Sequence, residues 1–402
     1  MPSALVVEPF PAGRAGGGAV ASLALLQALR RSGWSVDLVL NFGGPDLVID
    51  PEVRALCREV VHVPRVRRRS PGAARLACLA RHGYWPRHRE ELWEAVRDRL
   101  RSGAYDVLLL DHLLTVECGR LAKEEGFDLP VVLREHNVEA DLQRRALRYV
   151  RGPGALAQCL VRLRRWTTIE SHLARYCDLA LAISEVDAAL LAAASPGFPV
   201  ASLPVPVDTA HYRPGPPLGA GKELVFVGGC HWPPNLDAVR WFVREVFPAV
   251  RARHPDAHLT VVGKEPPAWL GREPQVTAAG FVADERPLLA RARVFVAPIR
   301  FGSGVRMKLL SALAMGKAIV STRIGAEGIP LEHGHSVLFA DDAGAFADAV
   351  STLLTDDAAV ARLARNGLQT CLDAFEPGAV ARRLDGLLRA CFDGGAAARV
   401  RA

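Results

Sequence analysis

Apolar and polar positions in the first half of the chain follow the order of a strand, a loop and a helix. The apolar run 4–7 leads into a glycine-rich loop, and residues 19–33 then repeat apolar positions every three or four residues, which predicts an amphipathic helix. Gly33 marks the end of this helix, and a second apolar run, 35–40, follows. This order is typical of a parallel, doubly wound sheet.

The same alternation continues through the rest of that half. Apolar runs at 106–110 and 130–134 flank a helical stretch around 116–125. A long helical region, 155–176, precedes another strand and a helix that starts at Glu185. The first half is therefore predicted to form one α/β domain.

A stretch rich in proline and glycine, 195–222, predicts a linker or hinge between this half and a second one. Strand-like and helix-like segments alternate again beyond it. We therefore predict two doubly wound, Rossmann-like α/β domains, at 1–203 and 204–376. A C-terminal helix at 377–402 follows, and its return to the first domain is left open. The length of 402 residues agrees, because single cores rarely grow beyond roughly 250 to 300 residues.

Composition narrows the class of protein. Hydrophobic residues make up 50% of the chain and charged residues 23%, as in globular proteins, and no stretch approaches the roughly 18 uninterrupted apolar residues of a membrane span. The start lacks a basic leader and Glu8 interrupts its apolar run, so we expect no signal peptide and a cytoplasmic protein. The eight cysteines are scattered, which predicts neither a disulfide framework nor a zinc site.

The net charge of +7 arises largely from arginines between 65 and 89. Such a run suits an anionic substrate or the anionic face of a membrane, and it is equally typical of a solvated surface. Residues 81–93 mix aromatic and basic side chains and are predicted to border an acceptor site or a membrane, so peripheral membrane contact is one expected option. No nucleic-acid-binding motif accompanies the charge, and no nucleic acid partner is expected.

The segment 298–328 is the clearest candidate for a binding site. Its strand end is followed by a loop, 301–304, in which two glycines permit positive φ and close approach of a ligand. A helix is predicted to open near Val305, where unpaired backbone N–H groups, Arg306 and Lys308 suit an anion such as a diphosphate. The alternative is an ordinary strand–loop–helix connection with solvated basic residues.

Two segments that follow predicted strands in the first half are candidates for function, one rich in glycine and one polar. Three consecutive glycines at 16–18 do not fit G-x-G-x-x-G, so a nicotinamide cofactor is not supported, and a plain turn is the alternative. Glu135, His136 and Asn137 follow the strand at 130–134. Ligands bind at the carboxyl ends of strands in open α/β sheets, so these side chains are candidates for function.

Several motifs resemble those of one enzyme family. They are REHNVEA, AISEVDAALL, FVGGCHWPPNLDAVRWFVREVFP, AGFVAD and, above all, FGSGVRMKLLSALAMGKAIVSTRIGAEGI. With the two-domain order they are similar to the retaining glycosyltransferase family four, especially its exopolysaccharide-type sugar transferases, and the similarity spans nearly the whole chain. The resemblance implies the glycosyltransferase B fold (GT-B), in which two Rossmann-like domains face a cleft.

The resemblance also implies roles for individual residues. The donor-binding residues are expected to be Gly16, Gly17, Gly18, Gly228, Gly280, Phe281, Val282, Gly302, Ser303, Gly304, Val305 and Ser311. Catalytic roles fall to His136, Arg306 and Lys308, the two cations neutralising the departing nucleoside diphosphate. Asn137 and Glu139 are expected to bind the acceptor. No cofactor and no metal ion are expected, because backbone amides and a helix N-terminus can hold a diphosphate unaided.

The chain departs from the family pattern at three places. Ser303 and Ser311 stand where the family usually has two glutamates, the second of which binds the nucleotide ribose. The hinge motif Pro-Asn-Gly-Val-Asp appears as PVPVD at 204–208, and an arginine and a lysine of many relatives are missing from FVGGCHWPPN. We expect these departures to change donor affinity or donor identity. Because the arginine and the lysine of the relatives are missing, Arg306 and Lys308 are expected to supply more of the positive charge at the diphosphate.

The resemblance implies an enzyme that moves a sugar from a nucleoside diphosphate sugar to a hydroxyl or amine with retention of configuration. The acceptor would be a glycan, a lipid-linked molecule or a small molecule. Two alternatives stay open. A B-fold epimerase or phosphorylase would need a carboxylate base, for which Glu135 and Glu139 are candidates. A sugar-nucleotide-binding partner without catalysis would agree with the missing glutamates.

Overall fold

The computed structural model of the chain describes residues 1–13, 17–65, 90–215 and 221–392. The chain divides into two compact units, passing from the first to the second between Pro206 and Val207 and returning between Glu376 and Pro377. Each unit has its own sheet and its own hydrophobic core. Gly16 and most of the arginine-rich stretch between 65 and 89 lie outside the described residues.

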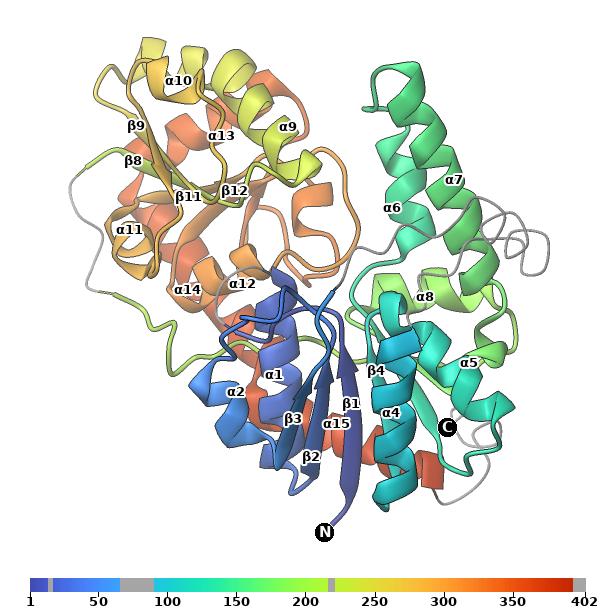
Figure 1. Cartoon of the computed structure of the whole chain (residues 1–402). Coiled ribbons are helices and arrows are strands. Elements are labelled where there is room, and N and C mark those ends of the chain that lie inside the picture. Colours follow the sequence, from blue (N-terminus) through green and yellow to red (C-terminus); the bar gives the residue numbers. More distant parts are fainter. Residues whose placement is uncertain (14–16, 66–89, 216–220, 393–402) are drawn as a thin grey trace. The chain divides into compact units, whose positions relative to one another are not determined.

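The first unit contains a seven-stranded sheet in the order β3-β2-β1-β4-β5-β6-β7 (Figure 1), and every neighbouring pair is parallel. The strands are β1 (Ser3–Glu8), β2 (Ser35–Leu40), β3 (Glu59–His62), β4 (Val107–Asp111), β5 (Val131–Glu135), β6 (Leu179–Ala182) and β7 (Val200–Ser202). The central strands β1, β4 and β5 are buried along their whole length, as expected for near-continuous apolar runs covered on both faces. Their register sets Asp111 of β4 opposite Arg134 of β5.

Helices cover both faces of this sheet. They are α1 (Gly17–Arg31), α2 (Pro51–Leu56), α4 (Glu90–Ser102), α5 (Val116–Glu124), α6 (Glu139–Ala146), α7 (Pro153–Glu170), α8 (Glu185–Ala194) and α15 (Pro377–Phe392). One core contains Leu29 of α1 and Leu384 of α15, and the other contains Trp93 of α4 and Trp166 of α7. The sheet is therefore doubly wound.

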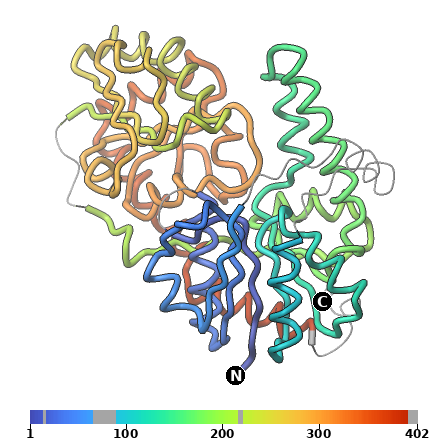
Figure 2. Tube along the Cα trace, in the orientation of Figure 1, coloured from blue at the N-terminus to red at the C-terminus, as the bar shows by residue number. Residues whose placement is uncertain are grey.

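The C-terminal helix α15 packs against the first unit, and Figure 2 follows the chain along it. The indole Nε1 of Trp34 donates a hydrogen bond to Asp385 Oδ1 at 2.8 Å, and the hydroxyl of Ser32 donates one to the carbonyl of Ala381 at 2.8 Å. Trp34 is fully buried, so α15 completes the core on that face of the sheet.

The second unit contains a six-stranded parallel sheet in the order β10-β9-β8-β11-β12-β13. Its strands are β8 (Glu223–Val227), β9 (His258–Val262), β10 (Val276–Gly280), β11 (Val294–Ala297), β12 (Ala318–Ser321) and β13 (Leu338–Phe339). Its helices are α9 (Pro233–Trp241), α10 (Phe247–Arg253), α11 (Arg286–Arg291), α12 (Met307–Ala314), α13 (Ala343–Thr355) and α14 (Asp357–Phe375), with a π-helical turn at Phe242–Val246. Phe242, Phe247 and Phe346 form the aromatic centre of the core.

The prediction of two Rossmann-like α/β domains is confirmed. The bounds of two predicted helical segments differ from the structure by a few residues. The helix expected to open near Val305 begins at Met307, because Gly302 and Gly304 hold the preceding loop in positive φ (142° and 77°) and Arg306 is its N-cap. The helical region expected over 155–176 consists of α7, which ends at Glu170, and a 3-10 helix at Leu173–Arg175. No helix in the described part of the chain is long and apolar enough to cross a membrane.

Candidate functional site

The carboxyl edge of the second sheet is lined by glycines. Gly228 follows β8, Gly263 follows β9 and Gly280 ends β10, and these strands lie side by side. A Cβ at Gly263 would lie 2.4 Å from the backbone of Gly228, so only glycine permits this close approach. The next strand, β11, leads into the loop that contains Gly302 and Gly304. Backbone groups rather than side chains therefore form much of this edge.

Arg306 holds the loop after β11 in shape. Its Nη1 donates hydrogen bonds to the carbonyl of Ser303, at 2.6 Å, and to the carbonyl of Gly304. A Cβ at Gly302 would lie 2.7 Å from Arg306 Nη2, so the guanidinium fills the space that glycine leaves. Ser303 and Val305 are buried in the same loop. The position of Arg306 shows a structural contact that the sequence did not predict.

Lys308 lies two residues further, in the first turn of α12, and its amine reaches the end of β8. Its Nζ donates to Asn235 Oδ1 at 2.6 Å and lies 4.6 Å from the centroid of the Phe226 ring. A Cβ at Gly228 would lie 2.6 Å from Nζ, so the glycine makes room for the ammonium group. Burial, with a smaller effect of Arg306, lowers the pKa of Lys308 to about 7. Lys308 is thus neutral in a large fraction of molecules at neutral pH, whereas the sequence predicted a fixed cation.

The remaining predicted donor residues of the second unit surround this edge. Gly280 has a φ of 67°, and Phe281, beside it, is 56% exposed with Lys264 Nζ 5.0 Å from its ring centroid. Val282 follows and is partly exposed. Ser311 is partly exposed as well, and its hydroxyl donates to the carbonyl of Met307 at 3.2 Å, a common backbone contact of serine inside helices.

The polar residues at the end of β5 in the first unit form a buried network. His136 Nε2 and Arg134 Nη1 both donate to Asp111 Oδ1, at 2.8 and 3.0 Å, and the hydroxyl of Ser22 donates to Oδ2 at 2.7 Å. Burial by itself would raise the pKa of Asp111, but His136 and Arg134 outweigh it and hold that pKa well below its usual value. Asp111 is therefore a carboxylate that fixes the ring of His136.

Glu8, at the end of β1, adds a second carboxyl group to this network. It is fully buried, and neither of its side-chain oxygens has a hydrogen-bond partner among the described residues. Burial raises the pKa of Glu8 well above its usual value, Asp111 raises it further, and Arg134 opposes both. Burial thus favours the neutral form of Glu8, next to the ionised Asp111. The sequence had shown Glu8 only as an interruption of an apolar run.

His112 occupies a strained position directly after β4. Its φ is 85°, which is unusual for a residue other than glycine and often occurs at functional sites. Its ring lies edge-on to Phe10 and to His136, with centroid separations of 5.2 and 5.4 Å. Burial, followed by the nearby His136, lowers the pKa of His112 to about 3, so the ring is neutral.

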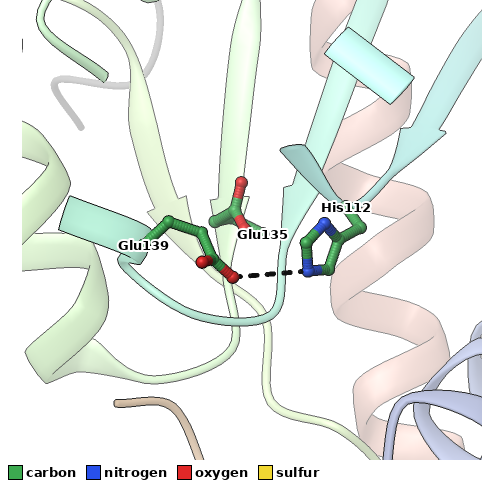
Figure 3. A group of neighbouring side chains, drawn as sticks. All are labelled: His112, Glu135 and Glu139. Carbon is green, nitrogen blue, oxygen red and sulfur yellow. Dashed lines mark ion pairs between the residues drawn. The ribbon is translucent and has the colours of Figure 1, made fainter. Parts of the chain in front are cut away.

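His112, Glu135 and Glu139 form the group drawn in Figure 3, and their ligand atoms all lie within 4.8 Å of one another. His112 Nε2 is 3.6 Å from Glu139 Oε1. His112 Nδ1 accepts a hydrogen bond from the backbone N–H of Leu114 at 3.1 Å, so the proton of the neutral ring is on Nε2. A protonated nitrogen has no lone pair to offer a metal ion. The group therefore does not fit a divalent metal in this arrangement.

Neutral acids explain how the carboxyl groups of this region can be buried together. Burial raises the pKa of Glu135 well above its usual value, and Glu139 and Glu170 raise it further. Burial also raises the pKa of Glu170 to about 8, although the backbone N–H of Ala140 donates to it at 3.1 Å. Asn137, the other predicted acceptor residue, donates to Glu139 Oε1 at 3.4 Å.

The structure thus gathers the predicted residues into two groups, one in each unit. The second unit contains Gly228, Gly280, Phe281, Val282, Gly302, Ser303, Gly304, Val305, Arg306, Lys308 and Ser311. In the first unit, His136, Asn137 and Glu139 follow β5, while Gly18 lies in the first turn of helix α1, at a separate place in the sequence. Gly17, the first residue of α1, is grouped with the second unit. The sequence missed Glu8, Asp111, His112, Asn235 and Gly263. Only their positions in the sequence could have identified them. Each of these residues ends a strand, directly follows a strand, or lies in the first turn of the helix after a strand.

Residues 221–356 match the family model described as Glycosyl transferases group 1. Solved structures resemble the whole chain: sucrose-phosphate synthase from Thermosynechococcus elongatus has a TM-score of 0.75 at 19% identity, covering 98% of this chain and 99% of its own. Anabaena HepE, solved with UDP and glucose, has a TM-score of 0.68 at 15% identity, and the match covers 97% of this chain and 100% of HepE. The chain has the GT-B fold. Its second unit carries a glycosyltransferase group 1 domain.

The group 1 domain of this GT-B protein spans β8 to α13 and so includes the whole glycine-lined edge with Lys308. A protein from the cps region of Klebsiella pneumoniae, described as uncharacterized, is 28% identical over 136 residues. That match covers 31% of this chain and 35% of the relative, about a third of each. Family four and its exopolysaccharide subgroup stay predictions for this chain.

Proposed function

We propose that this GT-B protein is a retaining, metal-independent glycosyltransferase of family four that moves a sugar from a nucleoside diphosphate sugar to an acceptor hydroxyl or amine. The observation that carries the proposal is the carboxyl edge of β8, β9, β10 and β11, where glycine backbones and Lys308 meet inside the group 1 domain. Backbone N–H groups and one buried amine suit a diphosphate, since they neutralise charge without a metal ion. HepE was solved with UDP and glucose, which supports a uridine nucleotide as the first donor to test.

Two kinds of contact support separate roles for Arg306 and Lys308. Arg306 binds two carbonyls of its own loop, so its proposed role is to present the loop's backbone N–H groups to the phosphates. Lys308 donates a hydrogen bond to Asn235 and lies against the Phe226 ring and Gly228. Its proposed role is to stabilise the negative charge that grows on the departing diphosphate.

The test is an incubation of the protein with a panel of uridine, guanosine and adenosine diphosphate sugars, with release of the nucleoside diphosphate as the readout. Each reaction is repeated with excess chelator, which should not change the rate. The anomeric configuration of the product, read by NMR, should match that of the donor. Release that depends on added magnesium or manganese would contradict metal independence. A product of inverted configuration would contradict the retaining mechanism.

Binding of UDP should weaken as pH rises above 7. A bound diphosphate would stabilise the ammonium form of Lys308, so its pKa in the complex would be higher than the value of about 7 in the protein by itself. Affinity is then full below pH 7 and falls, by at most about tenfold per pH unit, until the pKa of the complex is passed. Calorimetry at pH 8 in two buffers of different ionisation enthalpy should show proton uptake, and Lys308→Met should abolish it.

A second candidate function, a sugar-nucleotide-binding partner without catalysis, is favoured by one observation. Ser311 stands where the family has a ribose-binding glutamate, and its hydroxyl is bonded to the carbonyl of Met307. Such a partner protein would bind UDP and release no nucleoside diphosphate from any donor of the panel. Binding without turnover would therefore decide for this candidate.

Ser311→Glu should strengthen UDP binding by about 10-fold to 100-fold, because a carboxylate can accept hydrogen bonds from ribose hydroxyls that serine does not reach. The partly exposed position leaves the new charge in contact with solvent. Titrations with UDP and with 2′-deoxy-UDP measure the effect, and the deoxy form should gain less. Ser311→Ala is the matched control for loss of the hydroxyl and should bind UDP normally. Weaker binding by Ser311→Glu would mean that the ribose lies elsewhere.

A further inference from the structure

Helices α6 and α7 form an antiparallel hairpin (Figure 1). Several apolar side chains of α7 are exposed to solvent. We call residues 147–162 the hairpin tip. Leu156, Leu160 and Val161 are 42%, 48% and 70% exposed, and these large apolar residues fall within two turns of α7. Leu156 and Leu160 are four residues apart and so share one face of the helix. An apolar cluster of this kind on a surface is typical of an interaction site.

The C-terminal half of α7 packs into the core of the first unit, which fixes the position of the hairpin tip. Trp166 and Ile169 are buried in the core of the first unit. Closer to the tip, the thiol of Cys159 lies 3.3 Å from the carbonyl of Gln143 in α6, which joins the two helices. The helix is therefore a fixed support for its exposed end. At the turn itself, a Cβ added to Gly152 or Gly154 would meet no atom within 4 Å, so the tip is open on that side.

Between Asp141 and Glu170 the charged residues of the hairpin have one sign only. Residues 142–169 contain no aspartate or glutamate and seven arginines, which equals the net charge of +7 of the whole chain. These residues are Arg144, Arg145, Arg148, Arg151, Arg162, Arg164 and Arg165. Arg144 and Arg145 pair with Asp141 of α6, whereas Arg148, Arg151, Arg162 and Arg164 have no ion pair in the described part of the chain. An anionic partner would complement the charge of this surface.

The arrangement of these side chains selects among anionic partners. Arg164 lies four residues after Leu160 on the same face of α7, and Arg148 and Arg151 lie in the turn before α7, so arginines flank the exposed apolar residues on both sides. A bilayer has the matching order, with acyl chains beneath anionic headgroups. A second copy of the chain would bring arginines against arginines, and a nucleic acid would leave the apolar tip unused.

We propose that the hairpin tip docks on the surface of an anionic phospholipid bilayer, with Leu156, Leu160 and Val161 at the level of the acyl chains and the arginines at the headgroups. Helix α6 begins at Glu139, three residues after His136. Docking therefore holds the carboxyl end of β5 near the lipid surface. The proposal does not rest on sugar transfer, since it is tested without any donor.

The experiment is co-sedimentation of the full chain with vesicles at low salt. Vesicles of equal parts phosphatidylglycerol and phosphatidylcholine should bind the protein, pure phosphatidylcholine should not, and salt should release it. The double variant Leu160→Glu with Val161→Glu should bind about tenfold more weakly or less, because two apolar side chains no longer enter the bilayer. The variant Arg162→Gln with Arg164→Gln should lose about fivefold for each arginine.

The matched control replaces two exposed apolar residues of the same unit that lie outside the hairpin. Val48→Glu with Val186→Glu adds the same two charges at positions that are 87% and 42% exposed, and it should bind vesicles as the natural chain does. All variants alter exposed residues, and equal melting temperatures would show that they fold. Hydrogen exchange of residues 154–162 should slow when anionic vesicles are added.

Three results would overturn the proposal. They are no binding to anionic vesicles at low salt, equal binding by the natural chain and both hairpin variants, and exchange protection that leaves residues 154–162 unchanged. A single-stranded RNA that displaces the vesicles, and that binds equally to the Leu160→Glu, Val161→Glu variant, would assign the arginines to nucleic acid instead.

Discussion

Replacing Lys308 by methionine should lower the turnover of sugar transfer by about 100-fold or more, on the order of 3 kcal/mol, as removal of one preorganised donor does at other sites of developing negative charge. The amine is held by Asn235 at 2.6 Å, above the Phe226 ring and against Gly228, so it needs no rearrangement to meet the phosphates. The charge on the diphosphate grows as the glycosidic bond breaks. The loss should therefore be larger in turnover than in UDP affinity.

The matched control for this variant is Lys317→Met. Lys317 is also buried, burial lowers its pKa to about 8, and its Nζ donates to the carbonyls of Ala290 and Ala292. It precedes β12 and so lies at the opposite edge of the same sheet. Lys317→Met should lower the melting temperature and leave turnover per folded molecule unchanged. If Lys308→Met kept full turnover with the donor at saturation, Lys308 would have no part in the transfer.

Replacing His136 by alanine should abolish or strongly reduce transfer and leave UDP affinity nearly intact. The histidine belongs to the first unit, whereas the proposed diphosphate site belongs to the second. Asp111, held also by Arg134 and Ser22, fixes the His136 ring through Nε2. Kinetics with the best donor and calorimetry with UDP measure the two effects separately. A variant that lost UDP binding, or that kept full transfer, would show that His136 does not face the sugar.

Asp111→Asn tests the positioning of His136 without removing the ring. Asparagine keeps the shape of the side chain but loses the charge that Arg134 and His136 share, so transfer should fall by about 100-fold or more with the donor affinity unchanged. A purely structural role would instead lower stability alone. The control is Asp37→Asn, another buried aspartate of the same sheet, which is bonded to Arg58 and Tyr105. It should lower the melting temperature and leave transfer per folded molecule intact.

The sequence by itself determined the elements and the fold class. Strands such as β4 and β5 are covered on both faces, so they appear as continuous apolar runs, and helices such as α1 repeat apolar positions at helical spacing. The sequence also predicted the loop after β11 from its glycines, because a backbone with positive φ favours glycine over other residues. These features follow from local physics, in which each residue's own conformation and its near neighbours in sequence decide the outcome.

Only the tertiary structure decided which side chains meet and in what state of charge. Asp111 and Arg134 are 23 residues apart, and the parallel register of β4 and β5 alone sets them opposite each other. Glu8 was an isolated charge in an apolar run until the pairing of β1 with β4 buried it near Asp111. Lys308 was predicted as a fixed cation, and its pKa of about 7 arises because folding removes water from its amine. Burial and electrostatic coupling depend on atoms far away in sequence, so local patterns carry no record of them.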